Sequence, residues 1–252
     1  MRFNHIWRVL LRHWTVYTKL YKTSFALNFV EPMLYLVAMG MGLGVFVNDI
    51  NGESYIKFIG PGIVASSAMF AAVYECTYGS YIRMTFQKTF DAILATPVNL
   101  ADLVGAEMTW GAVKSVIYGM TIMIVIALFG LVDSPLFLLA IPGIFLGGLI
   151  FAEISLITTA LVPGIDSFSY FYTLFMTPLF LFSGIFFPVA ALPEIIGNMA
   201  WFTPLYHVVN VCRETAGGRL AGCWASYAWL LVAAAALAPI TFRLMRRRVI
   251  DS

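Results

Sequence analysis

Residues 136–161 read LFLLAIPGIFLGGLIFAEISLITTAL and contain a single ionisable side chain, Glu153. An apolar stretch of about 20 residues can cross a hydrocarbon core of about 30 Å as a helix. Because lipid offers the backbone no hydrogen-bond partners, a helix is the form that we expect for each such stretch. Six such stretches fill the chain and predict an all-α membrane protein with six transmembrane helices, near 24–47, 57–81, 103–130, 136–161, 168–187 and 224–245.

The composition leaves no room for a soluble domain. Charged residues make up 11% of the 252 residues and hydrophobic residues 61%, whereas a soluble domain carries about 25% charged residues. We therefore expect one transmembrane domain over residues 1–252. We expect no cleavable signal peptide, because the first 23 residues are basic and lack a short apolar core followed by small residues. We also expect no nucleic-acid partner.

The basic side chains are distributed unevenly along the chain. Basic residues retained in short loops mark the cytoplasmic side of a membrane protein. One side of the predicted bundle carries only Lys57, Arg213 and Arg219. We therefore expect both chain ends in the cytoplasm, as an even number of spans requires. The basic residues of the predicted cytoplasmic side are Arg2, Arg8, Arg12, Lys19, Lys22, Arg83, Lys88, Arg243, Arg246, Arg247 and Arg248.

The first 23 residues predict an amphipathic helix that lies in the cytoplasmic headgroup layer. Apolar and aromatic residues recur there at helical spacing with basic residues between them, as in interfacial helices. The alternative is an ordinary basic flank of the first span. The apolar positions are Ile6, Trp7, Leu10, Leu11, Trp14, Tyr17 and Tyr21.

Residues 84–97 predict a short amphipathic helix on the cytoplasmic surface, which would suit the docking of a soluble partner. Its apolar face has the spacing of a helix, and Pro97 ends it. The alternative is a helix packed against the inner end of the bundle, and both can hold at once. The apolar face comprises Phe86, Phe90, Ile93 and Leu94, and the polar positions are Gln87, Lys88 and Asp91.

Residues 183–223 are too apolar for a solvated loop and too rich in proline for a span. We expect two short helices, near 193–200 and 204–215, that enter the outer leaflet and turn back within 188–215. Such backbone is tolerated at depth only when protein buries it or when it lines a cavity. The alternative is that these residues merely plug the top of the bundle. The predicted exit residues are Phe186, Phe187, Trp201, Phe202, Tyr206 and Arg213.

Ionisable side chains inside spans are costly and therefore indicate function. One face of the third predicted span carries Glu107, Trp110, Lys114 and Tyr118, which suggests a polar vestibule for the head group of an amphiphile. The alternatives are a structural network that pairs Lys114 with Glu107 or Glu153, and a proton relay. The predicted translocation-path residues are Glu75, Glu107, Trp110, Lys114, Tyr118 and Glu153.

Motifs for catalysis are not found in this sequence. The phosphate-binding pattern G-x-x-x-x-G-K-[ST] does not occur, so we expect that this chain does not hydrolyse ATP by itself and holds no cofactor of its own. The histidines are too scattered to predict a metal site. Ser183 with His207 leaves an intramembrane hydrolase as a weak alternative, since no base or oxyanion hole is predicted. Pairing of Cys212 with Cys223 stays open at this point.

Several motifs resemble the membrane subunit of type 2 ABC exporters over the whole chain. They are the run QKTFDAILATP at 87–97, the run FSGIFFP at 182–188, and Thr203-Pro204-Leu205 followed by Arg213. The sequence is similar, more closely, to the nodulation-type permeases in SSAM at 66–69, YE at 74–75, YG at 78–79, IRM at 82–84 and GAEMTWG at 105–111.

This resemblance implies export of a lipo-oligosaccharide, glycolipid or polysaccharide from the cytoplasmic side of a bacterial inner membrane. It further implies a homodimer that works with two copies of a separate ATPase, which would hold ATP and Mg²⁺. The 84–97 helix, with Pro97 at its end, would be the coupling helix, and the broken outer helices would line the exit. The alternatives are an ABC exporter of drugs or small amphiphiles, a self-sufficient secondary carrier and an intramembrane enzyme.

Overall fold

The computed structural model describes residues 3–250 except 48 and 51, and the side chains of 20–28 lie outside the description. The described residues form helices, turns and one isolated bridge between Ile50 and Glu53, without a β-strand. The predicted all-α class is therefore confirmed. Of the predicted interfacial segment 1–23, residues 1–2 lie outside the described residues.

Among the described residues, four helices are long and apolar enough to cross a membrane: Tyr55–Phe86, Leu100–Leu128, Pro135–Leu161 and Cys223–Ile250. The two other predicted crossings are helical but shorter in their apolar part. The first corresponds to Phe29–Val45, and the fifth to consecutive helical pieces between Ile165 and Phe182. The α-helices are α1 (Phe3–Val37), α2 (Tyr55–Tyr74), α3 (Thr89–Leu94), α4 (Leu100–Leu128), α5 (Ala140–Leu161), α6 (Phe168–Phe171), α7 (Thr177–Phe182), α8 (Glu194–Trp201), α9 (Pro204–Ala216) and α10 (Cys223–Ile250).

The helix that begins as α2 is the centre of the bundle. In its most apolar window, 83% of the residues are buried inside the protein, against 22% for α10. It packs against α1, α4, α5 and α9. Close approach depends on Gly111, where a Cβ atom would lie 2.7 Å from Cys76 Sγ and 2.8 Å from Ala152 Cβ. Helices α2, α4 and α5 therefore meet at a position where only glycine fits.

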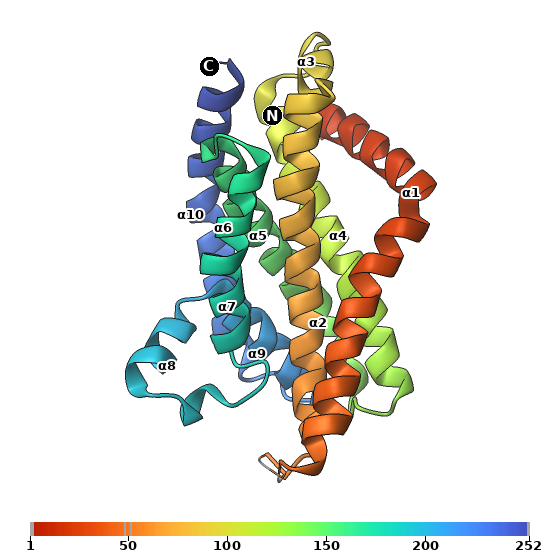
Figure 1. Ribbon diagram of the computed structural model, residues 1–252, viewed down its shortest axis with the longest axis vertical. Helices are drawn as coiled ribbons and strands as arrows, with labels where there is room; N and C mark the ends of the chain where they lie inside the picture. The colour runs from red at the N-terminus through yellow and green to blue at the C-terminus, as the bar shows by residue number, and fades with distance from the viewer. Residues whose placement is uncertain (1–2, 48, 51, 251–252) are drawn as a thin grey trace.

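The two ends of the bundle differ in construction. Figure 1 shows the start of α1, the end of α10 and α3 together at one end, which we call the α3 end. Helix α8 lies toward the opposite end, which we call the α8 end. The three basic segments of the sequence therefore gather at one end of the molecule, as the charge distribution predicts.

Helix α1 is continuous across the predicted boundary between the interfacial helix and the first span, near residue 23. Figure 1 shows it as two arms that meet at an angle, with the N-terminal arm crossing the top of the bundle. Trp7, Leu11 and Trp14 are about half exposed on this arm. Their exposure fits an arm that presents its aromatic side to lipid.

The prediction of one helix over residues 84–97 is wrong. The long helix from Tyr55 continues through two π-helical segments, Glu75–Gly79 and Ile82–Phe86, and α3 covers only Thr89–Leu94. Lys88 separates them with a left-handed backbone, φ 53°, which non-glycine residues adopt only in tight turns. Phe86 consequently ends the long helix, 65% exposed, while Phe90 is fully buried.

We expect Gly111→Ala to destabilise the bundle. The new methyl group would overlap Ala152 Cβ, which cannot rotate away, and overpacking of a core costs about 1–3 kcal/mol. The measurement is the apparent unfolding temperature of the purified protein in detergent. Gly42→Ala is the control, because no atom lies within 4 Å of a Cβ at Gly42. Equal unfolding temperatures for both variants would contradict the close packing.

Candidate functional site

Five ionisable side chains from three helices form one buried group, which we call the charge cluster: His13, Glu75, Arg83, Glu107 and Lys114. Glu75 accepts from Lys114 Nζ at 2.5 Å and from Arg83 Nη1 at 2.6 Å. Glu107 accepts from Arg83 Nη2 at 2.5 Å, and its other oxygen lies 3.1 Å from His13 Nε2. Arg83 therefore bridges the two carboxylates.

The local structure explains how these charges meet. Glu75 and Arg83 belong to the π-helical continuation of α2, which turns both side chains toward α4. Gly79 lies between them, and a Cβ there would be 3.2 Å from Arg83 Nη1 and 3.3 Å from Glu75 Oε1. Two carboxylates face an arginine and a lysine, so the cluster compensates its own charge, as burial in low dielectric requires.

The N-terminal arm of α1 is fixed to α4 beside this cluster. The His13 ring stacks on Trp110 with centroids 5.6 Å apart, and Lys114 Nζ lies 5.3 Å from the centre of the Tyr17 ring. Further along, His5 Nδ1 lies 3.1 Å from Asp102 Oδ2. The arm is therefore held by polar contacts on its inner side.

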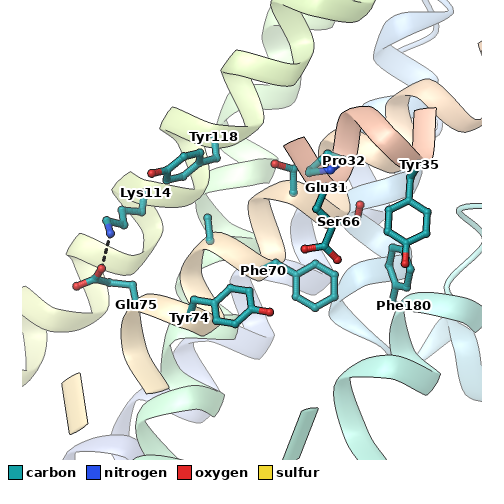
Figure 2. A pocket seen from close by; sticks show the side chains of 12 residues that line it. Glu31, Pro32, Tyr35, Ser66, Phe70, Tyr74, Glu75, Lys114, Tyr118 and Phe180 are labelled. Carbon is teal, nitrogen blue, oxygen red and sulfur yellow. Dashed lines mark ion pairs between the residues drawn. The ribbon is translucent and has the colours of Figure 1, made fainter. Parts of the chain in front are cut away.

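A cavity of about 450 Å³ opens beside the charge cluster between α1, α2, α4 and α7. Figure 2 shows the Lys114–Glu75 ion pair at one edge and the Tyr35 and Phe180 rings at the other. The remaining lining residues combine one carboxylate, two serine hydroxyls and aromatic rings, two of which are tyrosines, and include Glu31, Ser66, Ser67, Phe70, Tyr74 and Tyr118.

A row of touching aromatic rings, which we call the aromatic ladder, runs past this cavity from one end of the bundle to the other. Successive ring centroids are 5.0 to 6.4 Å apart, and Tyr172 stacks on Tyr74 at 5.0 Å. From the α8 end to the α3 end, the rings are Phe186, Phe180, Phe70, Tyr74, Tyr78, Phe168, Tyr81 and Phe86.

The structure brings together five of the six predicted translocation-path residues. Glu75 and Lys114 line the cavity, and Glu107 joins them through Arg83. Tyr118 also lines the cavity but is 1% exposed. Trp110 stacks on His13 and lines a smaller cavity over the charge cluster with Glu75 and Lys114.

Two expectations about ion pairing need correction. Lys114 pairs with Glu75, so the alternative that joined it to Glu107 or Glu153 is wrong, because α2 presents Glu75 to α4 at this level. Glu153 lies apart on α5, is 1% exposed, and neither carboxylate oxygen has a hydrogen-bond partner among the described residues.

The predicted coupling residues divide into an anchored set and an exposed set. Phe90 is buried with Val9 and Leu103, and Ile93 and Leu94 pack against the same cluster. This contact is the packing that the alternative interpretation expected. The exposed members of the predicted set are Phe86, Gln87, Lys88, Asp91 and Pro97. We call the segment 86–97 the α3 tip.

The predicted exit residues also divide. Arg213 points inward, donates to the backbone carbonyls of Gly184 and Phe58 at 2.9 and 3.3 Å, and covers the Phe58 ring. Phe186 is buried, and Phe187 and Tyr206 are half-buried, whereas Trp201 and Phe202 are exposed. All three cysteines are free thiols.

Sequence reasoning missed Arg83, His13 and Ser80 as members of the site. The charge distribution assigned Arg83 to a cytoplasmic loop, and His13 to the headgroup layer. Ser80 Oγ donates to Glu107 Oε2 at 2.6 Å. The signal for Arg83 was its spacing of eight residues from Glu75. That spacing places both residues on one side of a helix, provided that the helix continues beyond residue 81, where the predicted span ended. Within the described residues, no group of His, Cys, Asp and Glu could hold a metal ion.

Comparisons with known proteins agree with this architecture. The family profile described as ABC-2 type transporter matches residues 4–216, from α1 to the end of α9. The chain is 36% identical to nodulation protein J of Sinorhizobium fredii (strain NBRC 101917 / NGR234), over 86% of this chain and 82% of that protein. It is 39% identical to nodulation protein J of Rhizobium leguminosarum bv. trifolii, over 82% and 78% of the two chains.

A more distant relative is the inner membrane transport permease YadH of Escherichia coli (strain K12), 21% identical over 73% of this chain and 72% of that protein. Several apolar helices of spanning length are typical of a multi-pass membrane protein. The chain belongs to the ABC-2 type transporter family. Membership implies an ABC ATPase as its partner and a transport role rather than catalysis on this chain.

We expect Glu75→Gln to destabilise the protein far more than Glu153→Gln. The first change leaves Lys114 without its carboxylate, and breaking a buried ion pair costs about 3–5 kcal/mol. The second removes no ion pair. The measurement is the apparent unfolding temperature together with monodispersity in size-exclusion chromatography. A larger loss for Glu153→Gln would contradict the assignment of the structural charges.

Proposed function

We propose that this chain is the permease of an ATP-driven exporter that moves a lipo-oligosaccharide or a similar glycolipid outward from the cytoplasmic side. The observation that carries the proposal is the cavity beside the charge cluster, where a carboxylate and two serines face aromatic rings. Aromatic faces suit the C–H faces of sugar rings, and convergent polar groups bind hydroxyls and fix orientation. The resemblance to the nodulation-type permeases implies the same substrate class, and the similarity to nodulation protein J supports that resemblance.

The assembly that we propose is a homodimer with two ATPase subunits, which hold ATP and Mg²⁺, in a bacterial inner membrane. Six crossings with both chain ends in the cytoplasm fit the gathering of the basic segments at the α3 end (Figure 1). The segments Phe29–Val45 and 165–182 would supply the two crossings beyond the four long helices. Helices α8 and α9 would re-enter the outer leaflet near the exit.

The aromatic ladder extends from Phe86 at the α3 end to Phe186 near the α8 end. It would contact the cargo only where its rings are accessible, at Phe70, Tyr74, Tyr78 and Phe86, because Phe168, Tyr81, Phe180 and Phe186 are buried. A glycolipid would meet these accessible rings beside the cavity, where each offers a large apolar face.

We expect Tyr74→Ala to reduce substrate-stimulated ATP hydrolysis at least threefold, because it interrupts the ladder at the cavity. Tyr74→Phe keeps the ring and should retain most of the stimulation. The measurement uses proteoliposomes of the permease with its ATPase and compares a lipo-chito-oligosaccharide, the unacylated chito-oligosaccharide and a free fatty acid. Tyr170→Ala is the control, since Tyr170 is 70% exposed and does not line the cavity.

Only the acylated oligosaccharide should stimulate hydrolysis in this experiment. Equal stimulation by the free fatty acid would favour the alternative of a small-amphiphile exporter. No response to any of the three compounds would contradict the proposed substrate class.

The α3 tip is the proposed contact for the ATPase. Asp91 is exposed and lies 4.0 Å from Lys88, so Asp91→Lys places two cations on the tip without disturbing the buried Phe90 anchor. We expect at least a fivefold loss of ATPase co-purification with unchanged folding of the permease. Arg219→Gln, in the connection between α9 and α10, is the charge-changing control. Full co-purification of the Asp91→Lys variant would place the dock elsewhere.

A further inference from the structure

Three cavities follow one another from the α3 end into the bundle. The first is a groove of about 520 Å³ between α3 and the N-terminal arm of α1. The second is a vestibule of about 250 Å³ over the charge cluster. The third is the cavity of about 450 Å³ that Figure 2 shows.

Shared walls connect these cavities in that order. Arg12 and Gln87 line both the groove and the vestibule. Glu75 and Lys114 line both the vestibule and the inner cavity. A solute that enters beside α3 therefore meets the Lys114–Glu75 ion pair before it reaches the aromatic rings.

The Lys114–Glu75 pair separates the vestibule from the inner cavity, and its two side chains can move apart without the unfolding of a helix. It consists of two side-chain ends 2.5 Å apart, contributed by α4 and by the continuation of α2. Lys114 also faces the Tyr17 ring, which offers the ammonium group a second position at the vestibule side. A gap at this position would join the vestibule to the inner cavity.

Arg83 connects this pair to the α3 tip. Its guanidinium holds Glu75 and Glu107 at once, and it lies within the π-helical segment Ile82–Phe86, directly before the turn at Gln87 and Lys88. Short π-helical segments concentrate at functional sites and interrupt the regular hydrogen bonds of a helix. A rotation of this segment would withdraw Arg83 from Glu75 Oε1 and remove the contact that holds the carboxylate in the orientation in which Oε2 meets Lys114.

We propose that the Lys114–Glu75 pair is the inner gate of the transport route, and that Arg83 is the positioning residue that keeps it closed until the α3 tip moves. The gate selects for a head group with hydroxyl or charged groups, because such a group can replace the hydrogen bonds that the pair gives up, whereas an apolar molecule cannot. The direction of passage rests on the proposed function, but the existence of the gate does not.

The test follows water access to Ser66→Cys in inverted membrane vesicles that contain the permease and its ATPase. Ser66 lines only the inner cavity, about 13 Å along the helix from Glu75 at 1.5 Å per residue. Cys76, Cys212 and Cys223 are replaced by alanine in the background. The probe is a membrane-impermeant methanethiosulfonate, and no substrate is needed.

With the intact cluster we expect slow labelling of Ser66→Cys. Arg83→Gln and Glu75→Gln should each accelerate labelling at least tenfold, and Glu153→Gln should leave it unchanged. Gln87→Cys, at the exposed tip, should label rapidly in every variant and reports that the reagent reaches this face. Addition of ATP and Mg²⁺ to the intact cluster should raise labelling at least threefold.

Rapid labelling of Ser66→Cys with the intact cluster, or equal rates in the cluster variants, would overturn the gate. If Glu75→Gln fails to fold, Gly79→Ala is the second variant, because its methyl group presses on both Arg83 and Glu75 without removing a charge. Acceleration by Gly79→Ala supports the gate, and an unchanged rate overturns it. The proposed substrate class has its own test, and it is contradicted if no glycolipid stimulates ATP hydrolysis.

Discussion

The structure depends on the cost of burying charge in a lipid-solvated bundle. Glu75, Glu107, Arg83 and Lys114 can lie inside only because each finds an opposite charge from another helix within 2.6 Å. Removal of one partner leaves the other buried and uncompensated, so the cluster fixes the register of α4 against α2 more tightly than apolar packing alone would. The N-terminal arm of α1 joins this arrangement through His13 and Tyr17, which explains why a basic helix is held against α4 rather than away from it.

One helix, which begins as α2, contributes both to the close packing of the bundle and to its polar region. Up to Val73, the α2 helix is almost entirely buried among small residues and glycines of its neighbours. From Glu75 onward it changes to π-helical turns, and the buried side chains become charged. The closely packed first half of this helix holds the bundle together. The irregular hydrogen bonding of the second half suits a segment that moves together with the α3 tip.

The sequence predicted the all-α class, both short outer helices and the position of the exposed tip, because these features depend on hydropathy, proline positions and helical spacing, which can be read locally. It did not predict where the long helix ends. The positive-inside pattern assigned Arg83 to a loop, although its partners Glu75 and Glu107 hold it inside. Likewise, Lys88 looks like an ordinary helical residue, and only the left-handed backbone separates Phe86 from Phe90. Ion-pair partners depend on helix rotation and crossing, which a single sequence does not encode locally.

The polar and apolar features of the molecule are arranged in a consistent direction. The charge cluster lies toward the α3 end, the mixed cavity follows it, and the buried rings of Phe180 and Phe186 lie beyond. Arg213 then ties α9 to the backbone around Gly184, so the broken outer helices are fastened to the bundle rather than free in the membrane. Polarity thus decreases along the route from the α3 end. A cargo with one polar and one apolar part would meet, in sequence, groups that match first its head and then its chain.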